Sequence, residues 1–251
     1  MLVLVFLPVM AVVWLFDRDP GKYATGRMFR RLGSNMVAFN PAWKVHVTGD
    51  FPADMRNPYV VVCNHQSLAD IPIVSRLPWD MKWVGKASLF SIPVIGWMMK
   101  MSHDIPVRRG DRRSRAQVMI DIKERLAQNV SVMVMPEGTR SKDGRVGTFN
   151  DGAFKLALKM NLPILPIALD GAFDALPKDG WKFGSASQIQ LHVLDPVLPD
   201  DWDNGTAQCE HVRNLIISQI AEWRQVPASE IDRLASAPDS KIDLLADQTI
   251  K

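Results

Sequence analysis

Short apolar runs that end abruptly in polar residues recur along this chain and constrain its fold. The clearest run, residues 59–62, is Tyr-Val-Val-Val, and it leads through Cys63 into Asn64-His65-Gln66-Ser67. An apolar run without polar alternation is typical of a strand buried on both faces. Similar runs at 131–135 and 162–169 alternate with helical patterns, which indicates right-handed strand–helix–strand units. We therefore predict an α/β fold whose mainly parallel or mixed central sheet is flanked by helices.

The polar ends of these runs predict where ligands bind. In open α/β sheets, ligands bind beyond the carboxyl ends of the strands, where His65 is expected. Asp70 lies too far around a regular helix to meet His65, but a turn followed by a helix, with Ser67 as N-cap, would bring the two side chains together. A lone His at a strand end is usually structural. A His–Asp pair near arginines, with no nucleophile of its own, instead suggests that the substrate supplies both a nucleophile and an anion.

Two prolines qualify the predicted sheet. Pro163 and Pro166 lie in the run 162–169. Because proline cannot donate a backbone hydrogen bond, we predict that this strand lies at an edge or begins irregularly.

A charged loop at 111–115 should precede a helix at 115–129 with Ser114 as its cap, and residues 206–225 form a clear amphipathic helix.

Four of these polar segments form an ordered set of motifs. They are Asn64-His65-Gln66-Ser67-x-x-Asp70, Ile105-x-Val107-x-Arg109, Pro136-Glu137-Gly138-Thr139-Arg140-Ser141 and Leu162-Pro163-Ile164-Leu165-Pro166-Ile167. The set resembles the glycerolipid acyltransferases, and most closely the 1-acyl-glycerol-3-phosphate (lysophosphatidic acid) acyltransferases. Two positions depart from the family pattern: His103 replaces a Gly before the second motif, and Asn150 replaces a Lys after the third. The second departure removes a cation near the expected phosphate, so the acceptor head group stays open.

The resemblance implies acyl transfer from acyl-CoA or acyl carrier protein to the sn-2 hydroxyl of lysophosphatidic acid, in phospholipid biosynthesis. His65 would take the hydroxyl proton, and Asp70 would orient the imidazole. Backbone N–H groups after the strand at 59–62 would stabilise the oxyanion. The resemblance implies no cofactor and no metal.

The same resemblance assigns the substrate-binding residues. Arg109 and Arg140, with Lys86, would bind the phosphate, because guanidinium groups match phosphate oxygens in pairs. Glu137 would hold Arg140 or another donor in place, or accept a hydrogen bond from the glycerol part. Gly138 would let the backbone approach the ligand, and Thr139 belongs to the same loop.

Other functions compete with this hypothesis. The acceptor could be another lysolipid, such as a lyso-ornithine lipid or a lysophospholipid, or glycerol 3-phosphate. A non-catalytic membrane-binding module is the alternative from a different class. A hydrolase is disfavoured because the chain has no Gly-x-Ser-x-Gly elbow.

Composition narrows the partners. The net charge of +3 is too small to indicate a nucleic-acid partner, but it suits an anionic membrane surface. The two cysteines, Cys63 and Cys209, form no Cys-x-x-Cys pair, so we interpret both as packing residues in a reducing environment.

The N-terminal segment suggests contact with a membrane. Residues 1–16 carry no charge and as a helix would be roughly 24 Å long, slightly short of a span. A marginal transmembrane anchor and a helix within one leaflet are together favoured over a buried core helix. Arg27, Arg30 and Arg31 in the next predicted helix, 23–40, favour the cytoplasmic face and acidic head groups, although an ordinary amphipathic helix is equally consistent.

We divide the chain into membrane-associated helices (1–42), an acyltransferase domain (43–225) and a C-terminal tail of weak helix or disorder (226–251).

Overall fold

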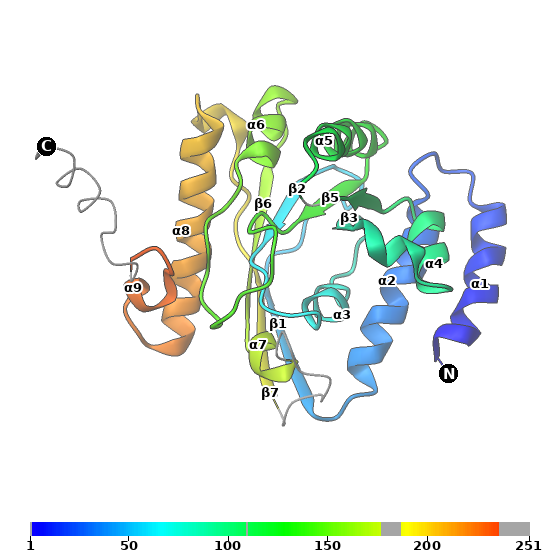
Figure 1. Cartoon of the computed structure of the whole chain (residues 1–251), viewed down its shortest axis with the longest axis horizontal. Helices are drawn as coiled ribbons and strands as arrows, with labels where there is room; N and C mark the ends of the chain where they lie inside the picture. Colours follow the sequence, from blue (N-terminus) through cyan, green and yellow to red (C-terminus); the bar gives the residue numbers. More distant parts are fainter. Residues whose placement is uncertain (1, 109, 177–186, 236–251) are drawn as a thin grey trace, which may run out of the picture.

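The computed structural model describes residues 2–108, 110–176 and 187–235. Within these ranges seven strands form one sheet, in the order β1-β7-β6-β2-β5-β3-β4 (Figure 1). The strands are β1 (Trp43–Gly49), β2 (Val60–Cys63), β3 (Met81–Lys86), β4 (Ile105–Val107), β5 (Ser131–Val134), β6 (Ile164–Asp170) and β7 (Ser187–Val193). All neighbouring strands are parallel except β6 and β7. The predicted mixed α/β sheet is thus confirmed.

The strand β6 does not lie at an edge of the sheet. An edge position was one of the two alternatives that its prolines predicted. β6 lies between β2 and β7, in the interior of the sheet. Pro166 offers its carbonyl to the Leu194 N–H at 3.0 Å, and the ladder to β7 begins only at Ile167. The missing N–H of Pro166 therefore costs no ladder hydrogen bond.

Helices cover both faces of the sheet. In Figure 1, α8 lies on one side of the long strands, and α2 and α3 lie on the other. The helices are α1 (Leu2–Phe16), α2 (Tyr23–Ala38), α3 (Asp70–Val74), α4 (Ile95–Met101), α5 (Arg112–Ala127), α6 (Gly152–Lys159), α7 (Ala172–Ala175), α8 (Gly205–Arg224) and α9 (Ala228–Ile231), with short 3₁₀ helices at Ala87–Ser91 and Pro199–Asp201. One apolar core joins α5, α6 and α8 to the sheet, and a second joins α3 and α7 to its other face.

The start of α5 differs from the sequence prediction. α5 begins at Arg112, and its cap is Asp111, whose carboxylate accepts from the N–H groups of Arg113 and Ser114. The Ser114 hydroxyl instead accepts from the Arg108 N–H at 2.9 Å. A carboxylate three residues upstream outcompetes the hydroxyl because it can accept two N–H groups at once.

The N-terminal helix pair packs on the sheet domain through a small apolar cluster of its own. Met10 of α1 is fully buried against Leu32 of α2 and Met98 of α4. Other α1 side chains stay exposed, among them Val12, Leu15 and Phe16. Among the residues described, no helix is both long and apolar enough to cross a bilayer.

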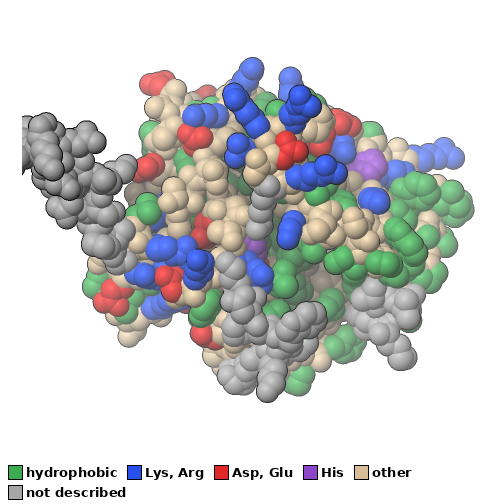
Figure 2. Space-filling model, viewed as in Figure 1, with side chains coloured by type: hydrophobic (Ala, Val, Ile, Leu, Met, Phe, Trp, Pro, Cys, Tyr) green, Lys and Arg blue, Asp and Glu red, His purple; other side chains and the backbone are tan. Residues whose placement is uncertain are grey.

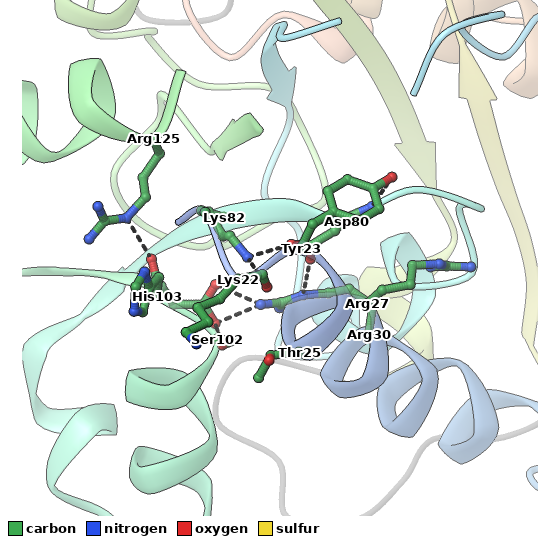
Figure 3. Close-up of polar contacts among 12 residues, drawn as sticks. Lys22, Tyr23, Thr25, Arg27, Arg30, Asp80, Lys82, Ser102, His103 and Arg125 are labelled. Carbon is green, nitrogen blue, oxygen red and sulfur yellow. Dashed lines mark hydrogen bonds and ion pairs between the residues drawn. The ribbon is translucent and has the colours of Figure 1, made fainter. Parts of the chain in front are cut away.

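A buried group of four charged side chains joins α2 to the start of β3 and β4; Figure 3 labels three of them, Arg30, Asp80 and Lys82. Arg30 donates to both carboxylate oxygens of Asp104, at 2.6 and 2.7 Å, and Lys82 pairs with Asp80. None of the four is more than 5% exposed. Gly26 permits this close approach, because a Cβ there would lie 2.1 Å from Asp80 Oδ2. The prediction that Arg30 attracts lipid head groups is therefore wrong, whereas Arg31 is exposed.

The described part of the C-terminal segment packs on the loop after β5. α9 follows α8 directly, and Arg213 of α8 pairs with Asp232. The Arg233 guanidinium donates to Ser141 Oγ at 2.6 Å and to Asp143 at 2.8 Å. These contacts brace the loop that carries the third sequence motif.

Candidate active site

A cavity of about 710 Å³ opens at the carboxyl ends of β2, β3, β4 and β5. Its volume is in the range of small-molecule sites. Parts of three motifs contribute to its wall: His65 from the first, Val107 from the second and the turn after β5 from the third. Side chains of α5 and the start of α6 complete the wall, most of it apolar. The predicted location at this rim of the sheet therefore agrees with the structure.

His65 and Asp70 meet directly. Asp70 Oδ2 lies 2.7 Å from His65 Nδ1, and Asp70 is fully buried. The chain turns through residues 64–69 before α3 begins, which is how a spacing unsuited to one helix brings the two side chains together. Among the described residues, Nε2 has no hydrogen-bond partner, and His65 lines the cavity. The ring is therefore oriented at one nitrogen and available at the other.

Asp70 also organises the turn that precedes it. Its carboxylate accepts from the N–H groups of Gln66 at 2.8 Å and Ser67 at 2.9 Å. Ser67 is not the N-cap that the sequence predicted, because α3 begins after Ala69, and the Ser67 hydroxyl donates to the Leu176 carbonyl instead. Burial raises the pKa of Asp70, while the hydrogen bond from His65 and the two N–H groups oppose that rise.

The backbone of His65 is held at both of its polar groups by the third motif. Its N–H donates to Glu137 Oε1 at 2.8 Å, and its carbonyl accepts from the Ser141 N–H at 2.7 Å. Glu137 Oε2 accepts from the Gly147 N–H at 2.9 Å. Burial raises the pKa of Glu137, and these two N–H groups oppose the rise. One role predicted for Glu137 was to hold Arg140 or another donor in place. The structure shows it accepting from two backbone donors, the N–H groups of His65 and Gly147.

Three N–H groups in the turn after β2, where the sequence predicted donors for an oxyanion, are already engaged by carboxylates. Those of His65, Gln66 and Ser67 all donate to the carboxylates of Glu137 and Asp70. Two buried carboxylates need donors of their own, and the nearest backbone groups supply them.

Gly138, Thr139, Lys86 and Arg140 lie at or after the carboxyl ends of strands at the same rim. Gly138 adopts φ +66°, a conformation that strains other residues, and Gly138 and Thr139 both line the cavity. Lys86, at the carboxyl end of β3, is exposed, and Arg140 is partly buried; neither lines the cavity. Arg109 lies outside the described residues.

The predicted site residues leave out several polar residues of the cavity wall, among them Arg112, Arg115 and Asn150. Arg112 and Arg115 project from α5, where they were interpreted as part of a charged loop and its following helix. Asn150, where the family pattern has Lys, lines the cavity, and its side-chain amide donates to the Pro136 carbonyl at 2.7 Å. Periodicity could have placed Arg112, Arg115 and Met119 on one face of α5, but nothing local showed what that face meets.

The first motif is also tied to the end of β6. The Asn64 side chain donates to the Leu169 carbonyl at 2.9 Å and accepts from its N–H at 3.0 Å. Gln66 donates to Asp170 Oδ1 at 3.0 Å and accepts from the Ala172 N–H at 3.1 Å. These amides act as supports for the turn that carries His65.

The two thiols are unsuited to nucleophilic catalysis. Cys63 is fully buried, and burial raises the pKa of its thiol well above the usual value. Burial likewise raises the pKa of Cys209 to about 12. Because the thiolate is the reactive form, neither cysteine can form an acyl-enzyme near neutral pH. Neither thiol therefore supplies a nucleophile at this site.

Comparisons with known proteins agree with the motifs. The family model described as Acyltransferase matches residues 44–170, which include all four motifs. A chloroplastic 1-acyl-sn-glycerol-3-phosphate acyltransferase from Brassica napus is 34% identical over 206 residues, 81% of this chain and 58% of that protein. The human 1-acyl-sn-glycerol-3-phosphate acyltransferase alpha is 30% identical over 234 residues, 87% of this chain and 78% of that protein. The chain thus spans little more than half the length of the Brassica napus relative.

A solved structure has the same fold. The crystal structure of the 1-acyl-sn-glycerophosphate (LPA) acyltransferase PlsC from Thermotoga maritima matches with a TM-score of 0.70. The match covers 89% of this chain and 95% of that chain, at 24% sequence identity. At this identity the likeness supports the arrangement of sheet and helices.

Proposed function

The chain belongs to the acyltransferase family, as its four motifs predicted, and we propose that it transfers a fatty acyl group to the sn-2 hydroxyl of lysophosphatidic acid, giving phosphatidic acid. The acyl donor is a thioester, acyl-CoA or acyl carrier protein. The names of the two relatives support the acceptor. The observation that carries the proposal is the contact between His65 and Asp70 on the wall of a cavity large enough for a lipid-like substrate.

The proposed reaction is a direct transfer. Nε2 of His65 takes the proton of the acceptor hydroxyl as its oxygen bonds to the thioester carbon. Asp70 holds the imidazole and stabilises the imidazolium that forms, and its own buried carboxylate is held by the turn. The C–S bond then breaks, the thiolate leaves, and the imidazolium returns the proton to the sulfur. No acyl-enzyme forms, in keeping with the two buried thiols.

The acceptor phosphate is proposed to bind Arg140 and Lys86, with Arg109 as a third cation. A phosphate joined to the glycerol carbon next to the attacking one must lie close to His65. Arg140 is one residue from Ser141, which donates to the His65 carbonyl. Guanidinium groups at this place would fix the acceptor in register for attack.

An assay with several acceptors tests the proposal. Purified protein is given acyl-CoA or acyl carrier protein together with lysophosphatidic acid, lysophosphatidylcholine, a lyso-ornithine lipid or glycerol 3-phosphate. We expect thiol release and phosphatidic acid in equal amounts with lysophosphatidic acid, and slower or no product with the others. A thiol reagent will report the released donor thiol, because Cys63 and Cys209 are buried with raised pKa values. Thioester consumption without an acceptor would indicate a hydrolase, and no consumption at all a non-catalytic membrane-binding module.

The protein is also proposed to act on the cytoplasmic face of a membrane, with α1 lying in the lipid surface. The exposed side chains of α1, including Val12, Leu15 and Phe16, support this, and Figure 2 shows hydrophobic side chains over α1 and α4. Trp97 of α4 adds a further exposed aromatic ring. Exposed apolar area of this kind marks a surface for lipid or protein.

Flotation with vesicles tests the membrane proposal. We expect the protein to float with vesicles that contain phosphatidic acid. The double substitution Leu15→Ser and Phe16→Ser should reduce the floated fraction about tenfold or more, since burying each large side chain contributes about 1.5–3 kcal/mol. Ile120→Ser, an exposed apolar residue on α5, is the matched control. Equal flotation of all three proteins would contradict the proposal.

A further inference from the structure

Two arginines line the cavity but are not among the residues proposed to bind the acceptor phosphate. Arg112 and Arg115 are three residues apart on α5, so their side chains lie on the same face of that helix. Both are exposed. Within the described part of the chain, neither guanidinium has an ion pair or hydrogen bond. Figure 2 shows Lys and Arg side chains gathered over α5. These two are therefore cations available at the edge of a substrate-sized cavity.

The same face of α5 is apolar beyond the arginines. Val118, Met119 and Ile122 line the cavity, and Val84 and Val134 from the sheet line it too. From Arg112 to Ile122 the helix rises roughly 15 Å. The cavity is thus cationic near the start of α5 and apolar farther along. That pattern suits a ligand with an anionic group at one end and an aliphatic chain at the other.

The two substrates place their phosphates differently. In the acceptor, the phosphate is one glycerol carbon away from the carbon that bears the attacking hydroxyl, so it lies beside His65. In the thioester donor, the pantetheine arm separates the phosphate from the reacting carbonyl. The hydrogen bonds that hold His65 come from Asp70, Glu137 and Ser141, and none comes from α5. A cationic pair on α5 therefore suits the more distant phosphate.

We infer that Arg112 and Arg115 bind the phosphate of the phosphopantetheine arm of the acyl donor, with the acyl chain directed toward Ile122. The inference rests on the proposed function and extends it to the donor side of the site. The phosphopantetheine phosphate is common to acyl-CoA and acyl carrier protein. A pair of guanidinium groups one helical turn apart can grip such a phosphate from two directions.

The test compares donors with and without that phosphate. The donors are palmitoyl-pantetheine, which lacks it, and palmitoyl-phosphopantetheine, palmitoyl-CoA and palmitoyl carrier protein, which all have it. We expect Arg112→Ala and Arg115→Ala each to lower kcat/KM about tenfold or more for the three phosphate-bearing donors, mainly through the donor KM. Use of palmitoyl-pantetheine and the KM for lysophosphatidic acid should stay unchanged. Arg113→Ala is the matched control, because Arg113 is exposed on the same turn but does not line the cavity.

Three results would overturn the inference. An equal loss with palmitoyl-pantetheine would show that the arginines do not act on the phosphate. A raised KM for lysophosphatidic acid would assign them to the acceptor. A loss confined to the carrier protein would assign them to protein docking.

A binding measurement separates this inference from the proposed function. Should the wild-type protein release no thiol with any acceptor, the proposed transfer fails. Calorimetric titration with phosphopantetheine and with pantetheine then still tests the arginines. Tighter binding of phosphopantetheine that Arg112→Ala abolishes and Arg113→Ala preserves would uphold the phosphate site, and equal binding by all three proteins would refute it.

Discussion

Replacing His65 by alanine is expected to lower kcat by about two to four orders of magnitude with little change in the KM for lysophosphatidic acid. The imidazole is held at Nδ1 by Asp70, and Nε2 is the proposed base for the acceptor hydroxyl. Removing it takes away proton transfer in the transition state, but it leaves the proposed phosphate contacts of the ground state. Steady-state kinetics with varied acceptor at saturating donor measure both parameters.

The structure also predicts that this variant folds. After His65→Ala, the Asp70 carboxylate keeps the N–H groups of Gln66 and Ser67, and the backbone at position 65 keeps Glu137 and Ser141. The thermal midpoint should therefore change little. Asp70→Asn is a less direct test, because an amide cannot accept from all of these donors and would disturb the turn as well as the imidazole.

A control histidine is available far from the site. His46→Ala removes an exposed imidazole from β1, at the opposite edge of the sheet from β4, and should leave kcat unchanged. A loss of less than about tenfold for His65→Ala would exclude general base catalysis by this residue. A large loss accompanied by unfolding would instead make His65 a structural residue.

Local patterns in the sequence predicted the parts of the site that local geometry determines. The β2 strand, its polar end and the contact from His65 to Asp70 depend on a stretch of a dozen residues. The hydrogen bond between the His65 N–H and Glu137 does not depend on local sequence, because the two residues lie 72 positions apart. A sequence shows that both residues exist but not that strands β2 and β5 are neighbours with their ends in register.

Arginines were the residues most often misjudged, for the same physical reason. An arginine on an amphipathic helix has the same sequence pattern whether it meets water, lipid, a substrate cavity or a buried carboxylate. Arg30 follows a long apolar segment and so suggested lipid head groups, but its partner Asp104 is 74 residues away. Arg112 and Arg115 were interpreted as part of a charged loop and the start of the helix after it, but the fold also places them on the wall of a cavity. Only the tertiary arrangement separates these cases.

Replacing Arg30 by methionine is expected to lower the free energy of unfolding by about 3–5 kcal/mol, the usual cost of leaving one member of a buried ion pair without its partner. Asp104 would keep the Trp83 N–H at 2.9 Å and the Ser102 hydroxyl at 3.2 Å, but it would lose the cation that both of its oxygens face. Asp80 would remain paired with Lys82. Urea denaturation followed by circular dichroism should show a midpoint lower by about 1–2 M.

The neighbouring Arg31 provides the matched control and the decisive comparison. Arg31 is exposed on the same helix, so Arg31→Met should change the urea midpoint little and should weaken binding to anionic vesicles. If Arg30 were a lipid ligand, both variants would lose vesicle binding equally and neither would lose stability. The double variant Arg30→Met and Asp104→Leu should recover part of the lost stability, because it removes the unpaired charge. Recovery should be incomplete, since the Trp83 N–H would then lack its acceptor.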